Sequence, residues 1–364
     1  MTALYIILAI ILFGLIIAMH EFGHFTVARL FGVTVREFAI GMGPKLISKK
    51  SKKSGVVYSL RIFPIGGFCD MGEDVTAESE KRALEKDGVK TPPDDGYRVA
   101  DDPNHFSKKP VWQRILILLA GSFTNIIAGF IVMIILTAAT PTLYSNVVSG
   151  FAENASSYKS GLRTGDEIVS IAGHGTHMAN EVVYRVLMDG TEPVDIVVIR
   201  DGERVTLESV VFGTEEEEGL VIGVRDFNLE ATDKTVLSVL KHSFFHSKMT
   251  VDMVFDSIKG LISGKFGFKD LSGPVGVTSA ITSAAKSGVY DVVYLFIVIA
   301  INIGVVNLLP IPALDGGRVV FRLIELFTKK SVKPEIEGYI HLAGMALLLL
   351  LMVIVSVKDV INLF

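Results

Sequence analysis

The sequence predicts a multi-pass α-helical membrane protein with four transmembrane helices, a small cytoplasmic β-rich loop and an extracytoplasmic α+β domain. Hydrophobic residues make up 50% of the chain, charged residues only 20%, and the mean hydropathy is +0.49. Four segments are apolar over about the 20 residues that a helix needs to cross a bilayer. They lie near residues 3–22, 114–138, 289–309 and 340–357. The polar regions between them carry strand-like patterns, which predict the two β-containing parts.

The composition also limits the partners. The net charge is −4 and no basic face or stripe is visible, so a nucleic-acid partner is not expected. The lipid bilayer is the expected surrounding instead. Cys69 is the one cysteine, which excludes an internal disulfide.

Residues 1–30 are predicted to be the first transmembrane helix. A signal peptide is the alternative for this apolar stretch, but a basic leading region and a small-residue cleavage site are missing. The stretch instead continues directly into His20-Glu21-Phe22-Gly23-His24.

This His-Glu-x-x-His pattern predicts a zinc site. On a helix His20 and His24 share one face and Glu21 lies beside them, so both imidazoles can bind one ion. A catalytic zinc usually has three protein ligands and a water, which a neighbouring carboxylate can deprotonate. We expect Zn²⁺ at His20 and His24 with Glu21 as the general base. The plain alternative is a helix end with ordinary polar residues at the lipid interface.

Lysine and arginine indicate the orientation of the spans. They gather in the loop 31–113 and in the short loop after the third span, whereas the N-terminal tail has none. The excess of basic residues marks cytoplasmic loops. Both termini and the long loop 139–288 should therefore lie outside, with the histidine pair toward the cytoplasmic end of the first span.

A third zinc ligand is predicted in the region 289–317, which holds the third span and the segment after it. Pro310 and Pro312 discourage helix there, and irregular backbone at membrane depth is tolerated where it lines a cavity. Asp315 can supply a carboxylate oxygen to zinc, and Asn307 can offer an amide to a substrate. Asp-Gly-Gly alone is more often a turn, but the topology delivers Asp315 to the same side of the membrane as the histidines.

Together these residues resemble the site-2 proteases, specifically the bacterial RseP-like intramembrane zinc metalloproteases. Further matching segments follow the family's order: Gly41-Met42-Gly43-Pro44, Pro64-Ile65-Gly66-Gly67-Phe68, Met71-Gly72-Glu73-Asp74 and Leu271-Ser272-Gly273-Pro274-Val275-Gly276. The resemblance covers nearly the whole chain. It implies His20, His24 and Asp315 as metal ligands, Glu21 as general base and Asn307 as a substrate-contacting residue.

The resemblance also implies a bacterial plasma membrane protein that cleaves single-span membrane proteins, such as anti-sigma factors or remnant signal peptides. Two departures from the family's pattern are visible. Cys69-Asp70 stands where a valine and a lysine are expected, and Ser122 follows Gly121 where Gly-Pro is usual. Neither departure touches the predicted metal ligands.

The cytoplasmic loop 31–113 is predicted to contain strands at 33–40 and 56–62, followed by a solvated polar linker at 75–105. Such strands beside the site could bind an unwound substrate by strand addition. A helical substrate requires this, since its internal hydrogen bonds shield the scissile carbonyl. A purely stabilising sheet is the alternative.

The outer loop contains Ser160–Gly173, which resembles the Gly-Leu-x-x-Gly-Asp-x-Ile core of a bacterial PDZ domain. Residues 147–224 would form this domain. Inside it we expect a helix near 180–187, strands at 194–200 and 203–211, and a solvated acidic loop at 215–218. The domain could bind a peptide or ectodomain at its edge, or act as a gate against bulky ectodomains, and both roles stay open.

Residues 232–288 are predicted to form amphipathic helices on the outer membrane surface. His242 and His246 also show i, i+4 spacing, but they lack a neighbouring glutamate and lie on the wrong side of the membrane. They are expected to be surface or packing residues, like His341 at the start of the fourth span. The second and fourth spans are placed at 114–140 and 338–358, and Asn125 in the second is expected to hydrogen-bond between helices.

Two other functions compete with proteolysis. A receptor or scaffold would hold zinc structurally, but structural sites have four protein ligands and no fourth candidate lies near the motif. A metal transporter is disfavoured because the sequence shows no internal repeat.

Overall fold

The computed structural model describes residues 2–72, 102–217, 220–265, 267 and 271–361. The chain forms two compact units. The first comprises Met1–Gly129 and Met253–Phe364, and the second comprises Phe130–Asp252. Residues 73–74 of the predicted Met-Gly-Glu-Asp segment and most of the predicted linker 75–105 lie outside the described residues.

Four helices are long and apolar enough to cross a membrane, which confirms the four predicted apolar spans. The apolar stretch 3–22 is part of a longer helix that continues to Leu30, in agreement with the helix predicted at 1–30, because the metal motif belongs to the same unbroken helix. The four helices are α1 (Thr2–Leu30), α3 (Val111–Ala139), α8 (Val289–Asn307) and α10 (Pro334–Ile361).

Small residues bring α3 close to its neighbours in the first unit. A Cβ atom on Gly23 of α1 would lie 2.5 Å from the Ala120 carbonyl oxygen of α3. A Cβ atom on Gly304 of α8 would lie 2.9 Å from the Ser122 carbonyl oxygen. Glycines at such positions let helix backbones approach closely inside membranes. The shorter helices of this unit are η1 (Phe106–Lys108), α7 (Pro274–Ser287) and α9 (Asp315–Thr328).

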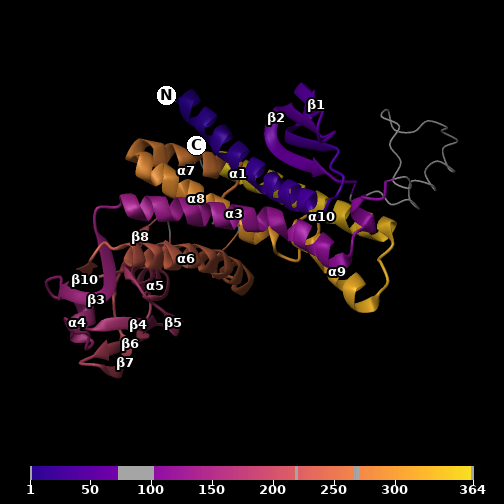
Figure 1. The fold of residues 1–364 in the computed structure, drawn as a ribbon. Coiled ribbons are helices and arrows are strands. Elements are labelled where there is room, and N and C mark those ends of the chain that lie inside the picture. The colour runs from indigo at the N-terminus through magenta and orange to yellow at the C-terminus, as the bar shows by residue number, and fades with distance from the viewer. Residues whose placement is uncertain (1, 73–101, 218–219, 266, 268–270, 362–364) are drawn as a thin grey trace. The chain divides into compact units, whose positions relative to one another are not determined.

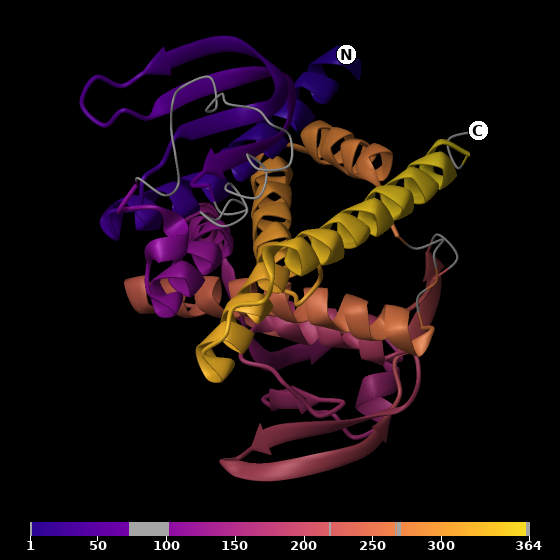
Figure 2. The ribbon, with the colours of Figure 1, turned by 90° about the vertical axis from the view of Figure 1, so that its right-hand side faces the viewer.

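The predicted cytoplasmic strands form a curled sheet of two long strands, β1 (Glu37–Lys50) and β2 (Val57–Asp70). The start of β1 pairs in parallel with the start of β2 and antiparallel with residues 67–70 at its end. The second half of β1 folds back along the start of β2. Figures 1 and 2 both show this sheet beside α1.

The strand predicted at 33–40 begins only at Glu37, so its first part is wrong. Val33 and Val35 are buried in a cluster that also contains Phe106 and Ile117. The alternation of apolar residues there reflects packing against helices and not strand pairing.

The second unit contains an antiparallel sheet with the strand order β10-β3-β4-β6-β7, to which β5 adds beside β4. The helix α5 (Ala179–Asp189) packs its apolar residues into the core of this unit. The helix and the two strands predicted there all form. The bounds are β3 (Leu143–Phe151), α4 (Ser156–Lys159), β4 (Glu167–Ile171), β5 (His174–Gly175), β6 (Val194–Arg200), β7 (Glu203–Val210) and β10 (Phe227–Thr232). The sheet thus extends beyond 147–224 at both ends.

The acidic run at 215–218 was expected to be a loop, but its described part is a strand. β8 (Gly213–Glu217) pairs antiparallel with β9 (Leu220–Val224). The apolar partner strand supplies the pairing while the carboxylates of Glu215 and Glu216 remain exposed.

The predicted region 232–288 forms α6 (Val236–Ser263) and α7. Within the second unit, His246 of α6 lies 3.0 Å from the Asn180 amide nitrogen at the start of α5. The Phe245 and His177 rings stack at 3.9 Å. These contacts join α6 to the start of α5.

Candidate active site

The helix α1 places the two motif histidines on one face near its end. His20 and His24 are both buried, and their Nε2 atoms lie 3.2 Å apart. This is the arrangement that the i, i+4 spacing predicts.

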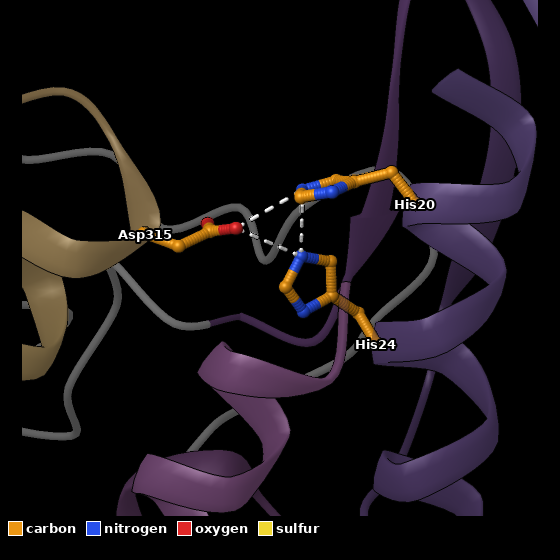
Figure 3. A group of neighbouring side chains, drawn as sticks. All are labelled: His20, His24 and Asp315. Carbon is orange, nitrogen blue, oxygen red and sulfur yellow. Dashed lines mark hydrogen bonds and ion pairs between the residues drawn. The ribbon is translucent and has the colours of Figure 1, made fainter. Parts of the chain in front are cut away.

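Asp315, the first residue of α9, lies against this pair. Its Oδ2 atom is 3.0 Å from His20 Nε2 and 3.3 Å from His24 Nε2. Figure 3 shows the Asp315 carboxylate pointing toward both imidazole rings. The described part of the chain therefore brings the three predicted ligands into one group that could hold a metal ion. The carboxylate comes from a segment almost 300 positions away in the sequence, which no local pattern could establish.

The geometry of this group fits zinc. A tetrahedral ion about 2.0–2.2 Å from each ligand separates neighbouring ligand atoms by roughly 3.3–3.6 Å. The three observed separations, 3.0 to 3.3 Å, need only a slight outward movement to match. Within the described residues, Asp315 Oδ2 is buried without a hydrogen-bond donor of good geometry. Two imidazoles and a carboxylate are also a donor set that catalytic zinc uses.

The second span orients the histidines. His24 Nδ1 lies 2.8 Å from the Ile117 carbonyl oxygen of α3. A carbonyl oxygen only accepts, so Nδ1 carries the proton and Nε2 is left with its lone pair for a metal. Sequence reasoning missed this contact because it joins residues 93 positions apart.

Gly121 of α3 allows this close approach. A Cβ atom there would overlap His24 Nε2 and lie 2.8 Å from His20 Cε1. The sequence signal that could have predicted this approach is the glycine itself, since glycines inside apolar spans mark close helix contacts in membranes.

The side chain of Glu21 extends from α1 to the end of β2. A Cβ atom on Gly67 would lie 3.1 Å from Glu21 Cγ, and the backbone N–H of Cys69 donates a hydrogen bond to the Glu21 carboxylate. The sheet formed by β1 and β2 therefore contacts the predicted general base on one side. These two contacts were not foreseen from the sequence.

The loop 308–314 connects α8 to Asp315. Asn307, the half-buried last residue of α8, lies at the opposite end of this loop and is not a member of the group formed by the histidines and Asp315. Asp315 is followed by two buried glycines. A Cβ atom on Gly316 would overlap the carbonyl oxygens of Leu308 and Leu309, so the start of α9 can fold onto this loop only with glycine there.

Ion pairs fix the rest of α9. Arg114 at the start of α3 contacts Glu325 at 2.6 Å, and both side chains are largely buried. Glu325 also accepts from Arg322, 3.1 Å away, and Arg322 pairs in turn with Glu337 of α10. The helices α3 and α10 are therefore linked through α9, the helix that begins with Asp315.

Comparison with known proteins agrees with this geometry. Peptidase family M50 matches residues 8–351. The chain is 34% identical over 370 residues to a Fusobacterium nucleatum protein named "Putative zinc metalloprotease", with 98% of this chain and 99% of the relative covered. It is 30% identical over 419 residues to the regulator of sigma-W protease RasP of Bacillus subtilis, with 99% of each covered. It is also 30% identical over 415 residues to the zinc metalloprotease RasP of Geobacillus kaustophilus, with 98% of this chain and 97% of the relative covered.

Both the family match and the relatives extend over nearly the whole chain, including the two motif-bearing helices. The relatives' names agree with the predicted zinc cofactor. The chain therefore belongs to peptidase family M50, the site-2 protease family of zinc metalloendopeptidases.

Proposed function

We propose that this protease hydrolyses peptide bonds inside the transmembrane segments of single-span membrane proteins. In this proposal His20, His24 and Asp315 hold the zinc ion and Glu21 is the general base. The observation that carries it is the convergence of two imidazoles and one carboxylate at 3.0–3.3 Å, with the imidazoles on an apolar helix. A hydrolytic site built on such a helix lies within reach of substrates in the membrane.

Each residue has a distinct part in this mechanism. Bound zinc supplies an acidified water and polarises the scissile carbonyl. The Glu21 carboxylate accepts the proton of the attacking water and passes it to the nitrogen of the leaving amine. The Cys69 N–H holds the Glu21 carboxylate, and the Ile117 carbonyl holds the His24 ring in orientation.

The substrate is held in an extended form beside this site. Residues 67–70 of β2 pair with residues 37–40 on one side only, among the described residues. Gly67, the first residue of this segment, lies beside the Glu21 side chain, so a substrate strand added along the segment would pass close to the general base. Asn307 contributes its amide to the substrate backbone in this proposal.

The enzyme works in the bacterial plasma membrane, with both termini outside and the site toward the cytoplasm. The outer region contains a PDZ domain at 147–224, supported by its sheet and the helix α5, and α6 and α7 lie along the outer surface. This domain either binds a peptide or excludes bulky ectodomains. The name of the Bacillus subtilis relative favours a role in regulated proteolysis, with anti-sigma factors or remnant signal peptides as substrates.

The test compares wild type, Glu21→Gln and Asp315→Ala as purified full-length proteins in detergent. Zinc content and cleavage of a model single-span substrate are measured on each. We expect Glu21→Gln to keep zinc and lose cleavage, and Asp315→Ala to lose both. Unchanged cleavage in either variant would contradict the assigned roles. A zinc-binding scaffold or a transporter would not respond to Glu21→Gln.

A further inference from the structure

We infer that His341, in the fourth span, is a positioning residue that holds the loop before Asp315 and thereby sets the zinc affinity. This inference rests on the proposed role of Asp315 as a zinc ligand. The fourth span supplies no ligand itself, and His341 lies on α10, opposite the backbone of the loop 308–314.

The first contact is a hydrogen bond. The backbone N–H of Ala313 donates to His341 Nδ1 at 2.9 Å. Because an N–H group only donates, Nδ1 must offer its lone pair. Ala313 is two residues before Asp315, so this bond acts on the backbone that delivers the carboxylate.

The backbone at Ala313 requires such a contact. Its φ angle is +78°, in the left-handed region. For any residue other than glycine this conformation is unfavourable in free energy, and surrounding contacts must offset that cost. Without the bond to His341, the loop would relax toward ordinary backbone angles and move Asp315.

A second contact lies one turn along α10. Gly344 is buried, and a Cβ atom on it would lie 2.5 Å from Pro312 Cβ and 2.7 Å from the Pro312 carbonyl oxygen. His341 and Gly344 are three residues apart and therefore share one face of the helix. This face holds both Pro312 and Ala313.

His341 also touches the helix that carries the ligand. Its ring lies 5.5 Å from the ring of Phe321 in α9. An ionisable side chain in an apolar span is costly and usually functional.

The experiment replaces His341 in the purified full-length enzyme. In His341→Asn the side-chain oxygen can take the place of Nδ1 and accept from Ala313. In His341→Gln the acceptor lies one bond farther out, and in His341→Leu it is absent. Zinc affinity is measured by competition with a chelator, and the ligand geometry by the visible absorption of the Co²⁺-substituted protein.

We expect His341→Leu and His341→Gln to weaken zinc binding by on the order of tenfold, as loss of outer-shell support does, and to alter the Co²⁺ spectrum. His341→Asn should stay within a few fold of wild type. The control is Leu342→Ala, a change at the adjacent, 57% exposed position, which should leave both readouts unchanged.

Wild-type zinc affinity in His341→Leu would overturn the inference, as would equal losses in His341→Asn and His341→Leu. If His341→Leu does not fold, the Asn and Gln variants still decide between the outcomes. Asp315→Ala is measured alongside. Retention of zinc by Asp315→Ala would contradict the proposed ligand set itself, which separates that failure from a failure of the role of His341.

Discussion

The Nδ1 atom of His24 lies 2.8 Å from the carbonyl oxygen of Ile117, so the second span directs the metal motif of the first. Gly121 follows Ile117 by four residues and faces the same imidazoles. The second span contributes no ligand to the group, yet its backbone determines where both rings lie.

Gly121→Ala should therefore weaken zinc binding. The added methyl group would overlap His24 Nε2 and displace His20, and disturbed outer-shell support costs about 10- to 100-fold in metal affinity. Chelator competition on the purified protein measures this. The matched control is Gly14→Ala on α1, where the added Cβ meets nothing within 4 Å. Equal zinc affinity of the two variants would contradict the close approach of α3.

The ion pair between Arg114 and Glu325 should stabilise the helices around the site. Its side chains are 7% and 15% exposed, so loss of this charged hydrogen bond should cost about 1.5–3 kcal/mol. A double-mutant cycle with Arg114→Met and Glu325→Gln, followed by unfolding in detergent, isolates the coupling energy.

The exposed pair Lys248–Asp252 is the control, with side chains that are 47% and 33% exposed. Its coupling should stay below about 1 kcal/mol. If the coupling energy of Arg114–Glu325 is no larger than that of Lys248–Asp252, the pair does not hold α9 in place.

Asp166 in the Gly-Asp segment should be required for stability of the second unit. Its side chain is fully buried, accepts from the Arg163 backbone N–H at 2.8 Å and pairs with Arg200 at 2.7 Å. Asp166→Ala should lower the free energy of unfolding of this unit by about 3 kcal/mol. This value is at the lower end of the range for removing one partner of a buried ion pair, because the remaining Arg200 can be hydrated again.

Limited proteolysis and thermal unfolding of the full-length protein check this. Glu203→Ala, an exposed change in the same sheet, should stay within about 0.5 kcal/mol of wild type. Similar protease sensitivity of the Asp166 and Glu203 variants would argue against a structural role for the segment.

The contact between α6 and α5 should weaken in acid. Burial, together with repulsion from His242, lowers the pKa of His246 from 6.5 to about 4. The folded state thus disfavours the protonated ring. The stability that neutral His246 contributes to the contact between α6 and α5 is fully present above pH 6.5. It declines as the pH falls toward 4, by up to about 1.4 kcal/mol per pH unit.

Hydrogen exchange of α5 and α6, corrected for the intrinsic effect of pH, measures this decline. The faster opening between pH 6.5 and 5 should be absent in His246→Phe, which cannot take up a proton. If wild type and His246→Phe respond to pH alike, His246 is not the group responsible.

The sequence was informative where local spacing determines structure. His20, Glu21 and His24 could be placed because one turn of helix fixes their arrangement, and Asp315 because the charge pattern assigned it to the same side of the membrane. The supporting contacts made by Ile117, Gly121, Gly67 and His341 could not be predicted, because each joins segments far apart in the chain. Most of these residues are apolar or small, and such residues form no distinctive local sequence pattern. His341 was expected only to pack, yet it accepts a hydrogen bond from Ala313.

The strands show the same limit. The start of the strand predicted at 33–40 was wrong because burial against helices produces the same alternation as a half-buried strand. The strand β8 was not predicted because its own glutamates do not favour a strand. It forms because the apolar strand β9 pairs with it.

The most direct test of the metal centre is zinc-edge X-ray absorption on the purified, zinc-loaded protein. For wild type and Glu21→Gln we predict the same spectrum, with two imidazole nitrogens and carboxylate or water oxygens at about 2.0–2.2 Å, whereas Asp315→Ala should lose the bound zinc and with it this spectrum. A sulfur ligand from Cys69, or a spectrum that Asp315→Ala leaves unaltered, would contradict the assignment of His20, His24 and Asp315 as the zinc ligands.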